Sequence, residues 1–80
     1  MRFLVSISRR DGLADPEGAT TARALRDLGY DEVGDVHFGR TILVEVSGDD
    51  VDTARSRIDE MCRRLLANPV IEDFTIEALP

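Results

Sequence analysis

The chain has 80 residues, of which 42% are hydrophobic and 32% charged, and its formal net charge is −6. Such an acidic balance disfavours nucleic acid and anionic membranes as partners. No apolar run approaches the roughly 20 residues that a membrane span needs. One cysteine excludes a disulfide framework within the chain. We therefore expect one cytoplasmic domain, residues 1–80, whose small core is supported by oligomerisation.

The first two elements have clear sequence signals. Residues 2–8 alternate between apolar and polar side chains, which predicts a half-buried strand with Phe3, Val5 and Ile7 on one face. Asp15-Pro16-Glu17 then predicts a helix start, because Asp15 caps free amides and proline suits the first helical position. Gly29 predicts the helix end, where a left-handed residue is favoured.

Residues 33–47 are the most informative segment. Their apolar residues fall on even positions, namely Val36, Phe38, Ile42, Val44 and Val46. A two-residue hairpin at Gly39-Arg40 would turn the two halves of this set to opposite faces. A three-residue loop would need a left-handed conformation at the β-branched Thr41. The simplest interpretation is one long strand, bent or bulged at Gly39.

A strand of this length implies a partner. Fifteen residues extend over roughly 50 Å, whereas an 80-residue globule has a radius of gyration of only about 12 Å. The far end of the strand would lie outside its own domain. A second copy of the chain is the simplest element for it to contact.

The remaining chain predicts a helix and a last strand. Asp49 or Asp50 caps a helix whose apolar stripe is Val51, Ala54, Ile58, Met61, Cys62, Leu65 and Leu66. Asn68-Pro69 ends this helix and leads with no spare residues into an alternating strand. We expect the inner face of that strand to be Val70, Phe74, Ile76 and Ala78.

These elements predict an α+β fold. It has two layers, with two helices on one face of an antiparallel sheet, in the order β-α-β(long)-α-β, and the dimer shares its sheet. If the long strand breaks into two, the topology becomes the ferredoxin-like βαββαβ.

Few residues suggest chemistry. The chain has no lysine and no glycine-rich phosphate loop. Cys62 lies on an apolar stripe, which favours a buried, unreactive thiol. His37 has no neighbouring nucleophile, and Arg9-Arg10 is best interpreted as a solvated loop. We expect no catalytic residue, cofactor or metal ligand in this chain. The candidate interface residues are instead His37, Phe38, Gly39, Arg40, Asn68 and Pro69.

A set of short motifs resembles a known family over nearly the whole chain. The set comprises Asp15-Pro16-x-Gly18, Leu28-Gly29-Tyr30, Val33, Val36-x-x-Gly39-Arg40, Met61-Cys62, Leu65-Leu66-Ala67-Asn68 and Val70-Ile71-Glu72-Asp73-Phe74. In this order, the motifs are similar to those of the small PurS subunits of phosphoribosylformylglycinamidine (FGAM) synthase. One difference is that the polar faces are rich in arginine where the family is expected to have lysine.

The resemblance implies a role in purine biosynthesis. In this family's enzyme, a large subunit uses ATP and Mg²⁺ to convert formylglycinamide ribonucleotide to the amidine, and a glutaminase subunit releases ammonia from glutamine. The small subunit is expected to carry no catalytic residue, to bridge these two subunits and to support ammonia transfer. It is expected to be a homodimer or a dimer of dimers.

Two other functions are compatible with the residues alone. One is a dimeric regulatory module that senses a small molecule, since two-layer α+β dimers of this size often bind amino acids at their interfaces. The other is a stand-alone enzyme that uses carboxylates. It is disfavoured because adjacent acids such as Glu72 and Asp73 face opposite sides of a strand.

Overall fold

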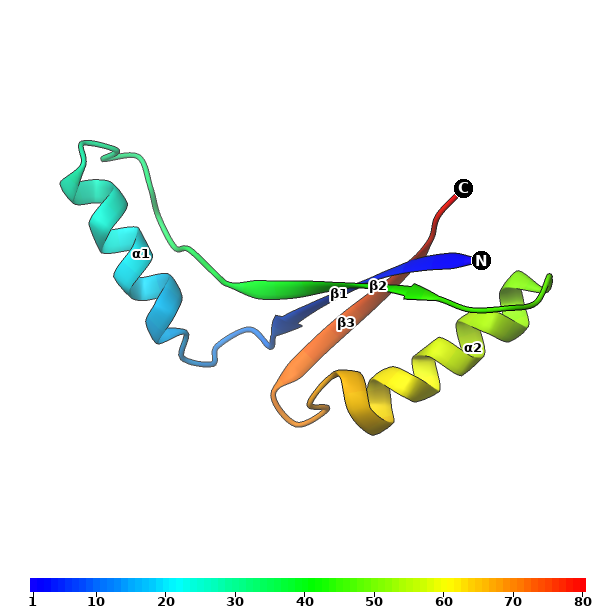
Figure 1. The fold of residues 1–80 in the computed structure, drawn as a ribbon. Helices are drawn as coiled ribbons and strands as arrows, with labels where there is room; N and C mark the ends of the chain where they lie inside the picture. Colours follow the sequence, from blue (N-terminus) through cyan, green and yellow to red (C-terminus); the bar gives the residue numbers. More distant parts are fainter.

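The computed structural model describes all 80 residues. In chain order its elements are β1 (Arg2–Arg9), α1 (Pro16–Asp27), β2 (Gly39–Glu45), α2 (Val51–Met61), a π-helical turn (Cys62–Leu66) and β3 (Glu72–Ala78) (Figure 1). The three strands form one antiparallel sheet in the order β2-β1-β3. The α+β class and the antiparallel sheet agree with the prediction.

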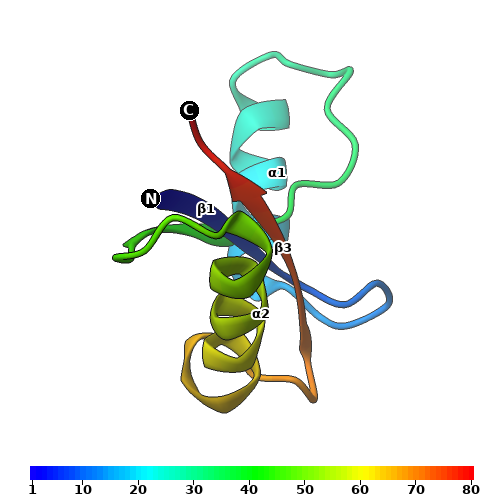
Figure 2. The same ribbon diagram turned by 90° about the vertical axis from the view of Figure 1, so that its right-hand side faces the viewer.

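The core lies between β1 and α2. Phe3 and Val5 of the central strand are fully buried, and Ile7 is 2% exposed, as their alternation predicts. From α2, Ala54 and Ile58 pack against them, and Cys62 follows in the π-helical turn. Figure 2 shows α2 across one face of the sheet. The other face carries no helix from this chain.

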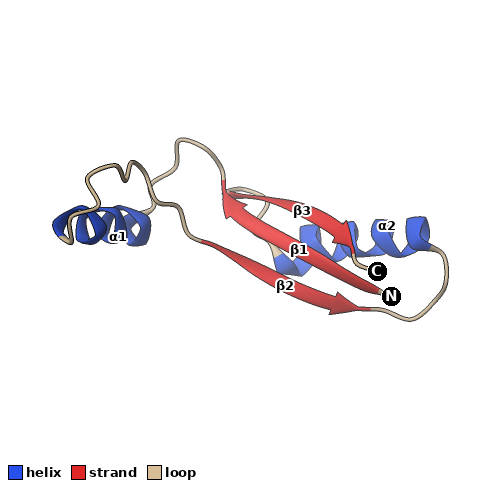
Figure 3. Cartoon of the chain, turned by 90° about the horizontal axis from the view of Figure 1, so that it is seen from above, coloured by secondary structure: helices blue, strands red, loops and turns tan.

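The first helix stands apart from this core. Figures 1 and 3 show α1 beyond the end of the sheet, joined to it by two extended connections. We call residues 15–38, which comprise α1 and the segment that returns to β2, the arm. The radius of gyration is 16.1 Å, against about 12 Å for a compact chain of this length. The prediction placed two helices on one face of the sheet. Within one chain, only α2 lies on that face.

Both ends of α1 and the start of α2 follow the sequence signals. Asp15 caps α1 by accepting a bond from the Gly18 amide, and Gly29 has the left-handed φ of +103°. Of the two candidate caps for the second helix, Asp50 is the one used, because its carboxylate accepts bonds from the Asp52 and Thr53 amides.

The long strand is shorter than predicted. β2 begins at Gly39 instead of bending there, and residues 33–38 have no strand neighbour in this chain. Their polar backbone groups bond to the start and end of α1: the Phe38 amide donates to Asp15, and Arg26 donates to the Val33 and Gly34 carbonyls. The hairpin alternative is absent, because this segment leads directly away from the sheet toward α1 (Figure 1).

The π-helical turn changes the predicted apolar stripe. The Ala67 amide bonds to the Cys62 carbonyl five residues earlier, so this turn holds one residue more than an α-helical turn. The extra residue rotates Leu66 and Ala67 toward the core and leaves Leu65 83% exposed. The assignment of Leu65 to the buried stripe was therefore wrong.

The join before β3 also differs from the prediction. Residues 69–71 form a turn, so Asn68-Pro69 does not lead into the strand without spare residues. Val70 lies in this turn and is 75% exposed, so it does not belong to the inner face of β3. Phe74, Ile76 and Ala78 do pack against the core.

Candidate functional site at the arm and sheet junction

The predicted interface residues gather at one end of the sheet. Residues 37–40 lead into β2, and Asn68 and Pro69 precede β3. The strand register brings these two chain segments together, because Ser8 pairs with Gly39 and Arg9 with Glu72. A shallow cavity of about 280 Å³ opens here, lined by Ser8, Arg9, Asp15, Glu17, Phe38, Gly39, Arg40 and Glu72.

Arg40 and Glu72 form the strongest polar contact of the junction. The two guanidinium nitrogens donate to the two carboxylate oxygens at 2.6 and 2.9 Å, and Arg40 also donates to the Leu66 carbonyl at 2.8 Å. Glu72 accepts a further bond from the Asn68 amide at 2.7 Å. The bond from Arg40, followed by that from Asn68, lowers the pKa of Glu72. This network fixes the end of the second helix against β2 and β3.

Asp15 ties α1 to the entrance of β2. One carboxylate oxygen accepts from the Gly18 amide at 2.9 Å and the other from the Phe38 amide at 2.8 Å. The bond from Gly18 is the main cause that lowers the pKa of Asp15, and the bond from Phe38 adds to it. His37 lies close by, with its Nδ1 4.0 Å from the same carboxylate and its side chain 70% exposed. Asp15 thus determines where the arm leaves the sheet.

Two glycines allow backbone segments to approach closely at this junction. A Cβ atom on Gly18 would lie 1.9 Å from the Val36 carbonyl oxygen. One on Gly39 would lie 2.5 Å from the Ile7 carbonyl oxygen. Both positions therefore exclude a side chain unless the backbone moves.

The turn before β3 is held by its own polar groups. The Asn68 side chain accepts a bond from the Val70 amide, and its carbonyl accepts bonds from the Ile71 and Glu72 amides. Arg10 reaches across from the end of β1 and donates to the Pro69 carbonyl at 2.6 Å. Pro69 and Asn68 are thus both fixed from within the chain, and Arg10 is not simply a solvated residue.

Sequence reasoning missed the two acidic residues on which this junction depends. Asp15 was predicted only as a helix cap, because nothing in the sequence indicates its bond to an amide 23 residues away. Glu72 was assigned to a strand, without its partner Arg40, which is 32 residues distant. The arginine beside a glycine at the predicted bend was the only available signal.

The side chains of the junction hold neighbouring backbone segments in position, and none of them is an evident reactive group. Both central carboxylates are occupied by hydrogen bonds, and no group of three histidine, cysteine or acidic side chains is arranged to hold a metal ion. Cys62, the one thiol, is fully buried, and this burial raises its pKa. No helix is long and apolar enough to span a membrane.

Three comparisons with known proteins all identify the same family. The family model described as "Phosphoribosylformylglycinamidine (FGAM) synthase", PurS, matches residues 2–80. The PurS subunit of Archaeoglobus fulgidus is 40% identical over 72 residues, which cover 90% of both proteins. The crystal structure of Methanocaldococcus jannaschii PurS, described as a subunit of formylglycinamide ribonucleotide amidotransferase in purine biosynthesis, has a TM-score of 0.84 at 36% identity, covering 95% of this chain and 92% of that one.

A structure of PurLQS from Thermotoga maritima contains a similar chain. It matches with a TM-score of 0.90 at 29% identity and covers 98% of this chain and 95% of that one. The match extends through the arm, the sheet and α2, which are the parts that meet at the junction. This chain therefore belongs to the PurS family of FGAM synthase subunits in purine biosynthesis.

Proposed function

We propose that this chain is the non-catalytic small subunit that holds the large subunit and the glutaminase subunit of FGAM synthase together and supports ammonia transfer between them. The observation that carries the proposal is the similarity, along almost the whole chain, to the small chain of the T. maritima PurLQS structure. In the proposed complex, the glutaminase subunit hydrolyses glutamine, and the large subunit uses ATP and Mg²⁺ to form the amidine. The complex would act in the cytoplasm.

The chemistry of the junction supports a bridging role. Its hydrogen-bonded groups keep the backbone in place, whereas His37 and Phe38 remain exposed beside it. We assign contact with the other subunits to these two exposed side chains. Arg40, Asn68 and Gly39 would act indirectly, by holding the backbone beside the contact surface. The side chains of Arg40 and Asn68 form hydrogen bonds within the chain, and the backbone of Gly39 packs closely against Ile7.

Self-association belongs to the same proposal. The arm has no packing partner in its own chain, and a second copy supplies one. We propose a homodimer as the unit that enters the complex. Its mass in solution would be twice the 8.9 kDa of one chain.

Sedimentation of the mixed subunits tests the bridging role. We expect the large and glutaminase subunits to sediment as one complex only when this chain is present, with ATP, Mg²⁺ and glutamine supplied. Substituting both exposed residues, His37→Ala with Phe38→Ala, should weaken the complex. A stable complex of the other two subunits without this chain would contradict the proposal.

Calorimetry separates this role from small-molecule sensing. The isolated chain should show no heat of binding with glutamine, ATP or the formylglycinamide ribonucleotide. Tight binding of any of them would favour the regulatory module.

A further inference from the structure

The outer edge of β3 is a strand edge that no element of this chain covers. β3 is the outermost strand on one side of the sheet, in the order β2-β1-β3. Figure 3 shows β2 and β3 at opposite edges, with the arm leading into β2. Self-association through the arm therefore leaves the edge of β3 open.

The free backbone groups of β3 lie on even-numbered residues. The Arg10 amide bonds to the Ile71 carbonyl, and the Leu79 amide bonds to the Arg2 carbonyl. Odd-numbered residues of β3 therefore turn their backbone groups toward β1, and even-numbered residues turn theirs outward. Three outward amides have no acceptor within the chain, namely those of Phe74, Ile76 and Ala78. A row of this kind is a template for another strand.

Arg55 of α2 reaches this edge from the helix side of the sheet. Its guanidinium donates to the Ile76 carbonyl at 2.7 Å and lies 5.9 Å from the centre of the Phe3 ring. A carbonyl oxygen has two lone pairs, so the Ile76 carbonyl can still accept a bond from a further strand. Arg55 forms no ion pair within the chain.

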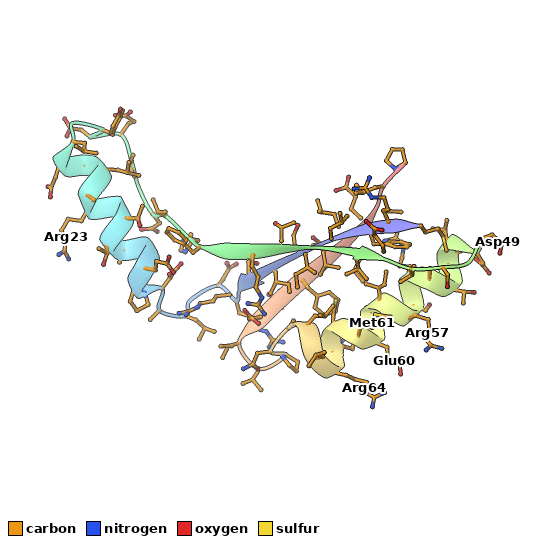
Figure 4. The ribbon with its side chains drawn as sticks, in the orientation of Figure 1. Arg23, Asp49, Arg57, Glu60, Met61 and Arg64 are labelled. Carbon is orange, nitrogen blue, oxygen red and sulfur yellow. The ribbon has the colours of Figure 1, made fainter.

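The neighbouring charges of α2 do not neutralise Arg55. Arg63 also lies on the β3 side, but its charge is paired with Asp59 at 2.6 Å. Figure 4 shows three further charged side chains of α2 that point away from the sheet: Arg57, Glu60 and Arg64. The helix side of the β3 edge therefore carries a positive charge without a counter-ion.

The outer face of β3 presents the opposite charge. Asp73 lies on this face and is paired with Arg10 at 3.3 Å. Glu77, two pairs of residues further along the strand, is exposed and forms no ion pair within the chain. A free positive charge beside Ile76 thus faces one side of the edge, and a free negative charge on the next residue faces the other.

A second copy of this chain does not complement that arrangement. The register that uses all three free amides in an antiparallel pair of β3 strands is centred on Ile76. Each Arg55 lies beside its own Ile76, so this register would bring two like charges together on one face, across a strand spacing of about 4.8 Å. Like charges directly opposite each other are destabilising. The edge therefore favours a strand from a different protein.

We propose that the β3 edge binds an extended segment of a partner subunit in the complex as an additional strand. In this segment an acidic side chain faces Arg55 and the adjacent basic side chain faces Glu77, because consecutive residues of a strand point to opposite sides. Backbone bonds to the three outward amides supply affinity, and the two charges select the register. The inference rests on the proposed bridging role.

The position of this edge suits such a contact. β3 begins at Glu72, which lines the same cavity as Phe38. The β3 edge therefore continues the surface that we assign to contact with the other subunits.

Residue-resolved amide exchange tests the additional strand. The ¹⁵N-labelled chain exchanges by itself and in the assembled three-subunit complex, and after quenching it is studied by NMR. We expect the amides of Phe74, Ile76 and Ala78 to exchange on the order of tenfold or more slowly in the complex. The amides of Thr75 and Glu77 are the internal control, because they face β1 in both states.

The possible failures are distinguishable. A complex in which the three outward amides exchange as fast as in the isolated chain would overturn the additional strand and leave the bridging role intact. Equal slowing of outward and inward amides would indicate general stabilisation and would also overturn it. Failure of the three subunits to assemble would overturn both proposals.

A charge reversal provides a second test. Glu77→Arg should raise the dissociation constant of the chain for the other subunits by about three- to tenfold. Glu32→Arg is the matched control, because Glu32 is also exposed and unpaired but lies in the arm. The urea midpoint of both variants checks that the chain still folds. Equal dissociation constants for the two variants would contradict the role of Glu77 at the edge.

Discussion

Replacing Gly18 by alanine should weaken α1, although alanine is the better helix former. In a free helix interior this substitution gains up to about 1 kcal/mol. Here the new Cβ atom would lie 1.9 Å from the Val36 carbonyl oxygen and 2.8 Å from an Asp15 carboxylate oxygen. The Val36 carbonyl must move by roughly 1.3 Å or more to make room. Such overpacking costs typically 1–3 kcal/mol.

We expect a net loss of about 1–2 kcal/mol in the local stability of the arm. Amide hydrogen exchange in α1 is the suitable assay, because the arm can open while the sheet remains folded. A loss of this size lowers the protection of the Ala22 to Leu25 amides by about 5- to 30-fold. Gly34→Ala is the matched control.

The control has no steric conflict. Gly34 also lies in the arm, and a Cβ atom there meets nothing within 4 Å. Its φ is not positive, so alanine should leave protection unchanged or raise it, by up to about fivefold, through a smaller unfolded-state entropy. Protection that rises in Gly18→Ala as it does in Gly34→Ala would show that α1 and the returning segment do not pack as described.

Four further substitutions or treatments test the junction and the core. Glu72→Gln should lower the urea midpoint at pH 7. Because the folded-state pKa of Glu72 lies below its unfolded value near 4.5, wild type progressively loses this advantage as pH falls below that value, and a difference that does not shrink as the pH is lowered would contradict the ion pair. Ile58→Ala should cost about 2–5 kcal/mol in urea unfolding, since Ile58 is fully buried; a loss under 0.5 kcal/mol, typical of a surface site, would misplace the core. Cys62 should react with a thiol reagent on the order of a hundredfold more slowly in the native than in the denatured chain; equal rates would mean that it is exposed. Gly39→Val should weaken the dimer and lower the melting temperature, since a Cβ atom there meets the Ile7 carbonyl oxygen at 2.5 Å; unchanged mass and melting would refute this close approach.

The strand β1, both ends of α1 and the start of α2 were predictable because their signals are local. Alternation identified Phe3, Val5 and Ile7 as buried, and short-range capping identified Asp15. The π-helical turn has no such local signal, because it depends on how the end of the second helix meets the sheet. An apolar stripe read at the α-helical period therefore placed Leu65 on the wrong side.

The position of the arm could not be predicted for a different reason. The even-numbered apolar residues of 33–47 correctly indicated that Ile42, Val44 and Val46 share the face that meets the core. They gave no sign that the strand begins only at Gly39, because the alternation continues through Val36 and Phe38. The contacts that fix the junction also join distant residues, such as Arg40 with Glu72, and depend on the completed sheet.

Amidine synthesis by the large and glutaminase subunits, with and without this chain, tests the proposed function most directly. Each reaction is run once with glutamine and once with a high concentration of ammonium as the nitrogen source. We expect synthesis from glutamine to require this chain, whereas synthesis from ammonium should be largely independent of it. Equal rates from glutamine in the presence and absence of the chain would contradict its role as the bridging subunit.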